Sequence, residues 1–270
     1  MIEASKEIVI SMGKGAKDLL VEIYGDLARP GIRQVGKALE TVVQTGALAL
    51  IPLRLANTYA AEWERKKFAD IAERFADIPE EEIEPARPEI AVPVLEALDY
   101  TDDADLRGLF VELLASASHA QKANFCHPSF VNVIKNLSSE EGRMLQEWAG
   151  RTHIPYLEIS NRLAGSSRQV ISEIHDLPDA IDYGHLLPVF LSNLAGLGIL
   201  EKSTMRWLRD EEYSELIEHA KRHWVKITPS LTQAIDLDLE EGKVIFDKGI
   251  VEVLPYGRLF QKACLPVNSS

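Results

Sequence analysis

Apolar residues recur at helical spacing through the first 78 residues. One set predicts the buried face of a helix that ends near Pro30 and Gly31, because proline and glycine together interrupt helices. A second helical segment is expected at about 32–45. Further on, apolar and charged residues are interleaved between 63 and 75, which predicts an amphipathic helix. The apolar residues of the first and third segments are Leu19, Leu20, Ile23, Tyr24 and Leu27, and Trp63, Phe68, Ile71 and Phe75.

The segment 46–55 stands out because its residues up to Leu53 are apolar on every side. The uncharged run around it covers 41–53, which is shorter than the roughly 20 residues of a membrane-spanning helix. A helix that is apolar all round is either buried in a protein core or embedded in lipid. Arg33, Lys37 and Arg54 flank the run and could meet anionic headgroups. Both interpretations remain open, and the candidate lipid-binding residues are Leu48, Leu50, Ile51, Leu53, Arg54 and Lys37.

The middle of the chain carries the clearest helix signals. Residues 77–89 hold three prolines and a block of acids, which predicts an extended surface linker and a domain boundary. Asp102 or Asp103 can cap a helix whose apolar positions between 106 and 117 form a core stripe. Pro128 is placed to open another helix. Farther along, Ser138 and Glu141 form a capping box.

The pattern changes beyond Gly150. Short helices are expected at 154–164, 167–175 and 185–197, and a charged helix at 208–224. The glycines within 194–200 predict a turn into a strand. Strands are expected at 225–228, 243–246 and 250–253, with Glu241-Gly242 and Lys248-Gly249 as turns. A closing helix is expected at 256–264.

These patterns predict a mainly α fold, a multi-helix bundle with a small α+β, winged-helix-like C-terminal region. The expected domains are N-terminal helices at 1–78, which include the apolar segment 46–55, and a linker at 79–89. A helical core at 90–150 and the α+β region at 151–270 complete the expected organisation.

Composition and charge narrow the function classes. The chain is 46% hydrophobic and 26% charged, as in ordinary globular proteins, and its net charge is −13. Such an acidic chain without a block of Lys and Arg disfavours nucleic-acid binding. Cys126 and Cys264 are far apart, which fits a reducing compartment. No signal peptide opens the sequence, so a cytoplasmic protein is expected, with peripheral membrane contact as a further possibility.

No catalytic motif emerges from the residues. Lys14 lies in a Gly-Lys-Gly fragment that lacks the rest of a phosphate loop. His219 and His223 have ligand spacing but lie on a highly charged helix. The adjacent Cys126 and His127 are poorly placed as a nucleophile and its base. The remaining polar cluster has the residue types of a loop that uses aspartates for turns, namely Asp176, Asp179, Asp182 and His185. A protein without enzymatic activity, metal or cofactor is expected.

Four phrases of the sequence together carry a family resemblance. They are GKALETVVQTGALALIPLRLAN at 36–57, the stretch FADIPEEEIEPARPEIAVPVLEALDYTDDADLRGLFVELLASA at 75–117, HPSFVNVIKNLSSEEGRMLQ at 127–146 and VEVLPYGRLFQKACL at 251–265. In this order they resemble the Abi-alpha family of bacterial proteins. The resemblance implies a role in abortive infection, a defence against phage. It brings no catalytic residues with it.

Two functional hypotheses follow from the resemblance and the apolar segment. In the first, a non-enzymatic antiphage protein binds or senses membrane lipid through 46–55 and acts with a partner protein from the same operon. In the alternative, the C-terminal α+β region serves as a protein-interaction adaptor of a defence operon, without lipid contact. The oligomeric state does not follow from the sequence.

Overall fold

The computed structural model describes residues 31–44, 58–163, 166–174, 186–218 and 244–265. Contacts divide the chain into two compact units. The first consists of 1–146 together with 259–270, and the second of 147–258. The segment 79–89 lies inside the first unit, and the four expected domains stay a prediction.

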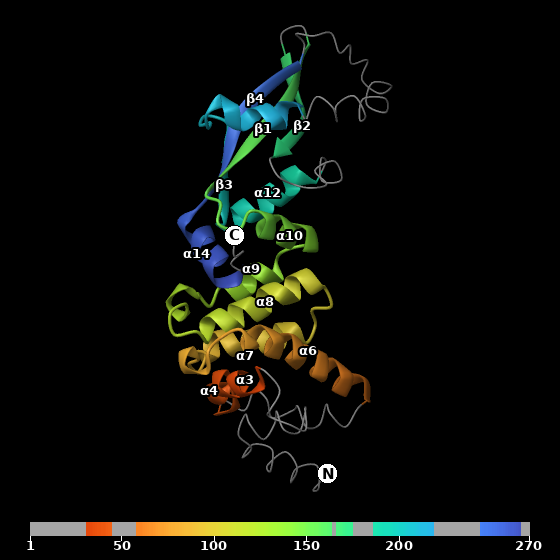
Figure 1. Cartoon of the computed structure of the whole chain (residues 1–270). Helices are drawn as coiled ribbons and strands as arrows, with labels where there is room; N and C mark the ends of the chain where they lie inside the picture. Colours follow the sequence, from red (N-terminus) through yellow and green to blue (C-terminus); the bar gives the residue numbers. More distant parts are fainter. Residues whose placement is uncertain (1–30, 45–57, 164–165, 175–185, 219–243, 266–270) are drawn as a thin grey trace. The chain divides into compact units, whose positions relative to one another are not determined.

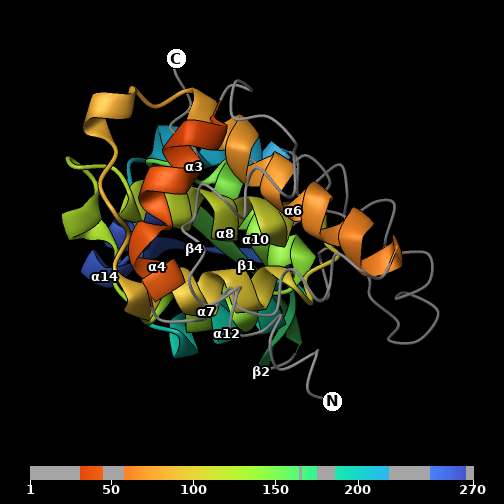
Figure 2. The same cartoon turned by 90° about the horizontal axis from the view of Figure 1, so that it is seen from below.

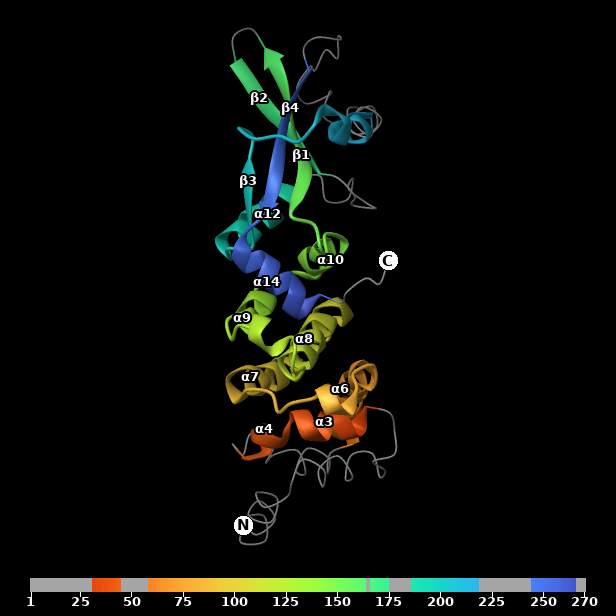
Figure 3. The ribbon, with the colours of Figure 1, turned by 60° about the vertical axis from the view of Figure 1, so that its left-hand side comes forward.

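The first unit is built from helices (Figures 1 and 3). Its α8 packs against α6, α7 and α9, while α3 lies beside the C-terminal part of α6 (Figure 2). The elements are α3 (Ile32–Ala38), α4 (Glu40–Gln44), α6 (Thr58–Ala76), η1 (Glu80–Glu82), α7 (Pro88–Leu98), α8 (Ala104–Ala117), η2 (Ala123–Phe125), α9 (Phe130–Lys135) and α10 (Ser139–Glu147). The last part of α14 (Pro255–Cys264) also belongs to this unit.

The core of this unit is formed by the predicted apolar stripes. Phe68, Ile71 and Phe75 of α6 are fully buried, as the amphipathic pattern predicts. The α8 stripe is buried from Leu109 onward, because α8 has helices packed around it. The C-terminal helix contributes Phe260, whose ring meets that of Phe130 edge-on at 5.4 Å between centroids. The apolar periodicity therefore located the core faces of α6 and α8 correctly. The stripe predicted between Leu19 and Leu27 lies outside the described residues.

The predicted helix starts are confirmed with one shift. Asp103 caps α8 by accepting a hydrogen bond from the Leu106 N–H at 2.9 Å. Ser138 and Glu141 form the reciprocal capping box, with distances of 3.2 and 2.7 Å. The helix expected to open at Pro128 begins at Phe130 instead, because Pro128 and Ser129 lie in a turn before it.

The Pro- and acid-rich segment 79–89 is paired with its neighbours in the first unit. The Glu84 N–H donates to the Ser118 carbonyl at 2.8 Å, and the Ala86 N–H donates to the Ala38 carbonyl at 2.9 Å. Ile83 and Ala86 are buried. The sequence pattern of acids and prolines thus predicted the exposed side of this segment. The two backbone hydrogen bonds and the buried side chains of Ile83 and Ala86 hold its other side against the helices.

The second unit contains an antiparallel four-stranded sheet of order β2-β1-β4-β3 (Figure 3). Its elements are β1 (His153–Leu163), β2 (Ser166–Ile174), α12 (Leu187–Gly196), β3 (Leu200–Ser203), η3 (Asp210–Tyr213) and β4 (Val244–Val253). The helix α12 packs against β2 and β3. Leu157 of β1 packs with Tyr213 and Leu216 in a small buried cluster.

Two secondary-structure predictions in this unit are wrong. The short helices expected at 154–164 and 167–175 are the strands β1 and β2. Their isoleucines, valine and tyrosine favour strands, and pairing between distant positions decides the outcome. The turn expected at Lys248-Gly249 is also absent, because β4 runs unbroken through it. Gly249 instead allows close approach, since an added Cβ would lie 2.6 Å from the Ser203 carbonyl oxygen.

The other predictions for this region fare better. The helix at 185–197, the following turn into a strand and the closing helix are confirmed as α12, β3 and α14. The charged helix at 208–224 is confirmed only for η3 and residues 214–218, and the strand at 225–228 lies outside the described residues. The mainly helical fold with a small antiparallel sheet is confirmed. Its finer winged-helix-like character stays a prediction.

Candidate functional site

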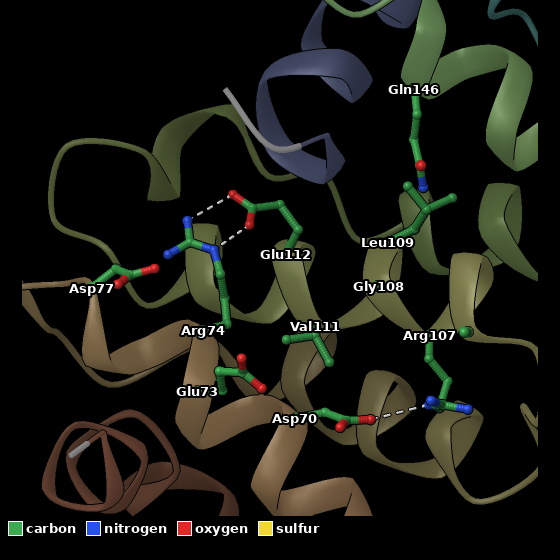
Figure 4. A pocket seen from close by; sticks show the side chains of 11 residues that line it. Asp70, Glu73, Arg74, Asp77, Arg107, Gly108, Leu109, Val111, Glu112 and Gln146 are labelled. Carbon is green, nitrogen blue, oxygen red and sulfur yellow. Dashed lines mark hydrogen bonds and ion pairs between the residues drawn. The ribbon is translucent and has the colours of Figure 1, made fainter. Parts of the chain in front are cut away.

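A groove of about 500 Å³ lies between α6 and α8 in the first unit (Figure 4). Four carboxylates line it, namely Asp70, Glu73, Asp77 and Glu112. Two guanidinium groups, those of Arg74 and Arg107, lie among them. The remaining lining is largely the α8 surface together with Gln146. We call this cavity the α6–α8 groove.

The sequence of α6 places its charges in a row along one side. Positions 67, 70 and 74 recur at three-and-four spacing and carry charges of alternating sign. Each charge meets an opposite one on a neighbouring element, and we call the set the charge ladder. Its pairs are Lys67 Nζ with Asp99 Oδ1 at 2.7 Å, Asp70 Oδ2 with Arg107 Nε at 3.1 Å, and Arg74 Nη2 with Glu112 Oε1 at 2.9 Å.

Glu112 is the most deeply placed charge in the groove, with 3% of its surface exposed. It accepts two hydrogen bonds from Arg74, one from Nε and one from Nη2. The Lys122 ammonium lies 3.7 Å from its Oε1. The hydrogen bonds to Glu112 raise the pKa of Arg74 above its ordinary value, although burial acts in the opposite direction. The guanidinium therefore stays charged and compensates the buried carboxylate.

The mouth of the groove carries excess negative charge. Glu73 and Asp77 are exposed, and neither forms an ion pair with another residue that the structure describes. Asp77 lies near the Arg74 guanidinium (Figure 4) and its charge also raises the pKa of Arg74. Arg107 is fully engaged, because it binds Asp70 and donates to the Asp102 carbonyl at 2.7 Å. The groove is thus suited to receive an ammonium or guanidinium group.

Comparison with known proteins gives one match. The family model described as abortive infection alpha covers residues 57–264. The chain belongs to the abortive infection alpha family. The resemblance seen in the sequence is therefore confirmed, and the family assignment indicates a bacterial protein of abortive-infection defence. Neither the curated proteins nor the solved structures contain a match to this chain.

Of the predicted lipid-binding residues of this Abi-alpha protein, only Lys37 lies within the described residues. Leu48, Leu50, Ile51, Leu53 and Arg54 lie outside the described residues. The Lys37 ammonium donates to the Glu80 carbonyl at 3.0 Å, while Arg33 lies 3.3 Å from the Glu80 carboxylate. Two of the three basic flanks of the apolar segment thus contact the same residue. No helix in the described ranges is both long and apolar enough to cross a bilayer.

The other candidate residues of the Abi-alpha chain form no catalytic arrangement where they are described. Cys126 is buried, and burial raises the pKa of its thiol to about 11. His127 is exposed, and its Nδ1 lies 2.6 Å from the Ser129 hydroxyl. The fragment around Lys14, the histidines at 219 and 223 and the polar cluster at 176–185 lie outside the described residues. In the described ranges no group of His, Cys, Asp and Glu could hold a metal ion.

The α6–α8 groove of this Abi-alpha protein was missed in the sequence. The signal available was the alternation of charge at 67, 70 and 74, which lies on the polar side of a predicted amphipathic helix. Such a row normally indicates a solvated face. The partners Arg107 and Glu112 are 37 and 38 positions away from their α6 residues, so only the fold reveals that the row is paired.

Proposed function

We propose that this Abi-alpha protein serves antiphage defence by binding rather than by catalysis, and that a partner protein inserts a basic group into the α6–α8 groove. The observation that carries the proposal is the pair of exposed carboxylates at the groove mouth, Glu73 and Asp77, neither of which forms an ion pair with a described residue. Family membership supports the defence role.

The rest of the groove supports the same kind of ligand. Arg74 and Arg107 are held by Glu112 and Asp70, so they are not available to an anionic ligand without breaking the charge ladder. A lysine or arginine of a partner can instead bind Glu73 and Asp77 without breaking an ion pair between described residues, since Arg74 is bound to Glu112. Charge-assisted hydrogen bonds of this type are about twice as strong as neutral ones. Glu73 lies on α6 and Asp77 directly follows its last residue, so the helix positions both carboxylates and favours specific binding.

The test removes the two charges without changing side-chain shape. A Glu73→Gln, Asp77→Asn variant is expected to lower protection against phage at least tenfold, measured as plating efficiency on cells that carry the operon. It is also expected to lose copurification of a protein encoded in that operon. A Glu81→Gln, Glu84→Gln variant removes two exposed carboxylates elsewhere in the same unit and serves as the matched control. Equal protection by both variants would remove the groove from the function.

A lipid contact through 46–55 is the second candidate, carried by the apolar run itself and its flanking cations. In this version the protein works in the cytoplasm, peripherally at the membrane. Flotation with neutral and anionic liposomes at low and high salt tests it. A Leu50→Asp, Ile51→Asp variant is expected to lose liposome binding while it keeps its helicity. Equal flotation of this variant would exclude the segment, and absence of binding by the original protein would leave the adaptor function alone.

The non-enzymatic part of the proposal has its own test. The purified protein is expected to leave single- and double-stranded DNA and RNA intact in the presence of Mg²⁺ or Mn²⁺. Metal analysis of the same preparation is expected to find no stoichiometric ion. Degradation that persists through purification, and that follows this chain through size exclusion, would instead make the protein a toxic nuclease.

A further inference from the structure

The segment that follows β3 in the second unit exposes two large apolar side chains. Met205 is 89% exposed and Trp207 is 63% exposed. Single apolar residues on a surface are ordinary. These two lie only two positions apart on one short connection, with an arginine between them. We call residues 204–209 the Met205–Trp207 loop.

Hydrogen bonds hold this loop at both ends. The Met205 N–H donates to the Ser203 hydroxyl at 3.3 Å, and the Leu208 N–H donates to the Tyr213 hydroxyl at 3.0 Å. Tyr213 is fully buried, and its own hydroxyl donates to the Gly249 carbonyl at 2.7 Å. The backbone on either side of the exposed side chains is thus tied to the sheet.

Two further contacts fix the loop against β4. The Arg206 guanidinium lies 2.7 Å from the Glu252 carboxylate. The start of the loop passes directly over Gly249, where an added Cβ would come within 3.2 Å of the Thr204 Cα. Exposed side chains on backbone that is already ordered lose less entropy when a partner binds. The loop is therefore arranged as a preorganised contact surface.

We infer that the Met205–Trp207 loop binds a partner protein that offers an apolar pocket with a carboxylate at its border. Trp, Met and Arg are the residue types enriched in the cores of protein interfaces, and Trp and Arg dominate their energetic hot spots. Positions 205–209 contain these types and one leucine, with no lysine or acid. The inference goes beyond the groove, because the loop belongs to the other unit.

The charges around the loop indicate which charge the partner's pocket should carry at its border. Arg206 is engaged by Glu252, whereas Arg209 is exposed and forms no ion pair with any other described residue. A carboxylate of the partner can pair with Arg209 while Trp207 enters the apolar pocket. An anionic membrane, which presents many negative charges at once, fits less well than a single carboxylate, because Asp210, Glu211 and Glu212 follow immediately.

Photo-crosslinking in cells tests this inference with the full-length chain. The photoreactive amino acid p-benzoylphenylalanine is placed at position 205, which leaves Trp207 and Arg209 intact. The matched control places it at Tyr100, which is 85% exposed in the first unit. After phage challenge and irradiation, position 205 is expected to give one heteromeric protein adduct, identified by mass spectrometry, that position 100 does not give.

Two substitutions make the result specific. Trp207→Ser and Arg209→Glu, each combined with the photoreactive position 205, are expected to reduce that adduct at least tenfold. The melting temperature should stay unchanged, because both side chains are exposed. Absence of an adduct, an adduct with a second copy or with lipid, or an adduct that survives both substitutions would overturn the inference. These outcomes do not depend on Glu73 and Asp77, so they are separate from those that test the groove.

Discussion

Arg74 on α6 and Glu112 on α8 form a two-point ion pair, with guanidinium Nη2 2.9 Å from carboxylate Oε1 and Nε bound to the other oxygen. The pair joins the α6 helix to the α8 helix, which also pack against each other. A buried pair of this kind contributes little net stability over apolar residues of similar size, but its loss on one side leaves an uncompensated charge.

Removal of Arg74 from the Arg74–Glu112 ion pair should destabilise the first unit. In an Arg74→Met variant, Glu112 remains 3% exposed with only the more distant Lys122 to compensate it. The free energy of unfolding is expected to fall by about 3 kcal/mol. Urea unfolding followed by circular dichroism measures this change. Arg33→Met provides the control, since the Arg33–Glu80 pair is largely exposed and its loss should cost less than about 1 kcal/mol.

A double variant shows whether the loss of stability comes from the uncompensated charge or from the loss of the ion pair itself. Arg74→Met combined with Glu112→Met leaves no charge in the buried position, so most of the lost stability should return. A double variant as unstable as Arg74→Met alone would show that the charges themselves, rather than their mutual compensation, are required.

Two glycines of the first unit should respond to alanine in opposite ways. Gly31 has a φ of 80°, and an added Cβ would lie 1.7 Å from the Ala72 carbonyl oxygen on α6. Gly31→Ala should therefore separate α3 from α6 and lower the melting temperature. Gly108 lies in α8 with no atom within 4 Å of an added Cβ. Gly108→Ala should stabilise the protein by about 0.5–1 kcal/mol, and calorimetry of both variants tests the contrast.

The α8 cap should give the protein a specific acid sensitivity. The pKa of Asp103 is lowered, first by the hydrogen bond from the Ser139 hydroxyl at 2.6 Å and then by the Leu106 N–H. A carboxyl whose pKa is lower in the folded state adds stability above its unfolded pKa of about 4. That contribution is lost as the pH falls through the folded value.

Asp103→Asn checks this effect, because the amide oxygen can still cap the helix without charge. The original protein should be the more stable of the two at pH 7, and the difference should shrink progressively below about pH 4. Urea titrations between pH 7 and pH 2.5 measure it. A constant difference across this range would contradict the assignment.

Both cysteines should be inert in the folded protein. Burial raises the pKa of Cys126 to about 11 and that of Cys264 well above its ordinary value. At pH 8 a thiol with a pKa of about 11 has about one thiolate in a thousand, and the thiolate is the reactive form. Iodoacetamide should therefore modify neither cysteine until urea unfolds the chain. Mass spectrometry of labelled native and unfolded samples reads the outcome, and fast native labelling would contradict the burial.

Local signals were predictable from the sequence, and distant pairing was not. The capping box of Ser138 and Glu141 involves residues three positions apart, so the sequence alone identifies it. For the α8 cap the sequence left Asp102 and Asp103 open, and the structure shows that it is Asp103. The strand β1 was mistaken for a helix because Ile154, Tyr156 and Leu157 are apolar in a mixed pattern, and pairing with β4 decides their conformation. The charge ladder could not be predicted for the same reason, because each of its ion pairs joins residues of separate elements that lie far apart in the sequence.

The route of the chain has a consequence for how the protein is made. Residues 147–258 interrupt the first unit, and the segment from Leu259 returns to it with the Phe260 ring edge-on to that of Phe130. A ribosome adding roughly 5–20 residues per second therefore releases the last piece of that core only after the whole sheet has been translated. Until then Phe130 lacks its aromatic neighbour. A nascent chain stopped before position 259, or a fragment ending near 150, would leave this nested core open to chaperones and proteases.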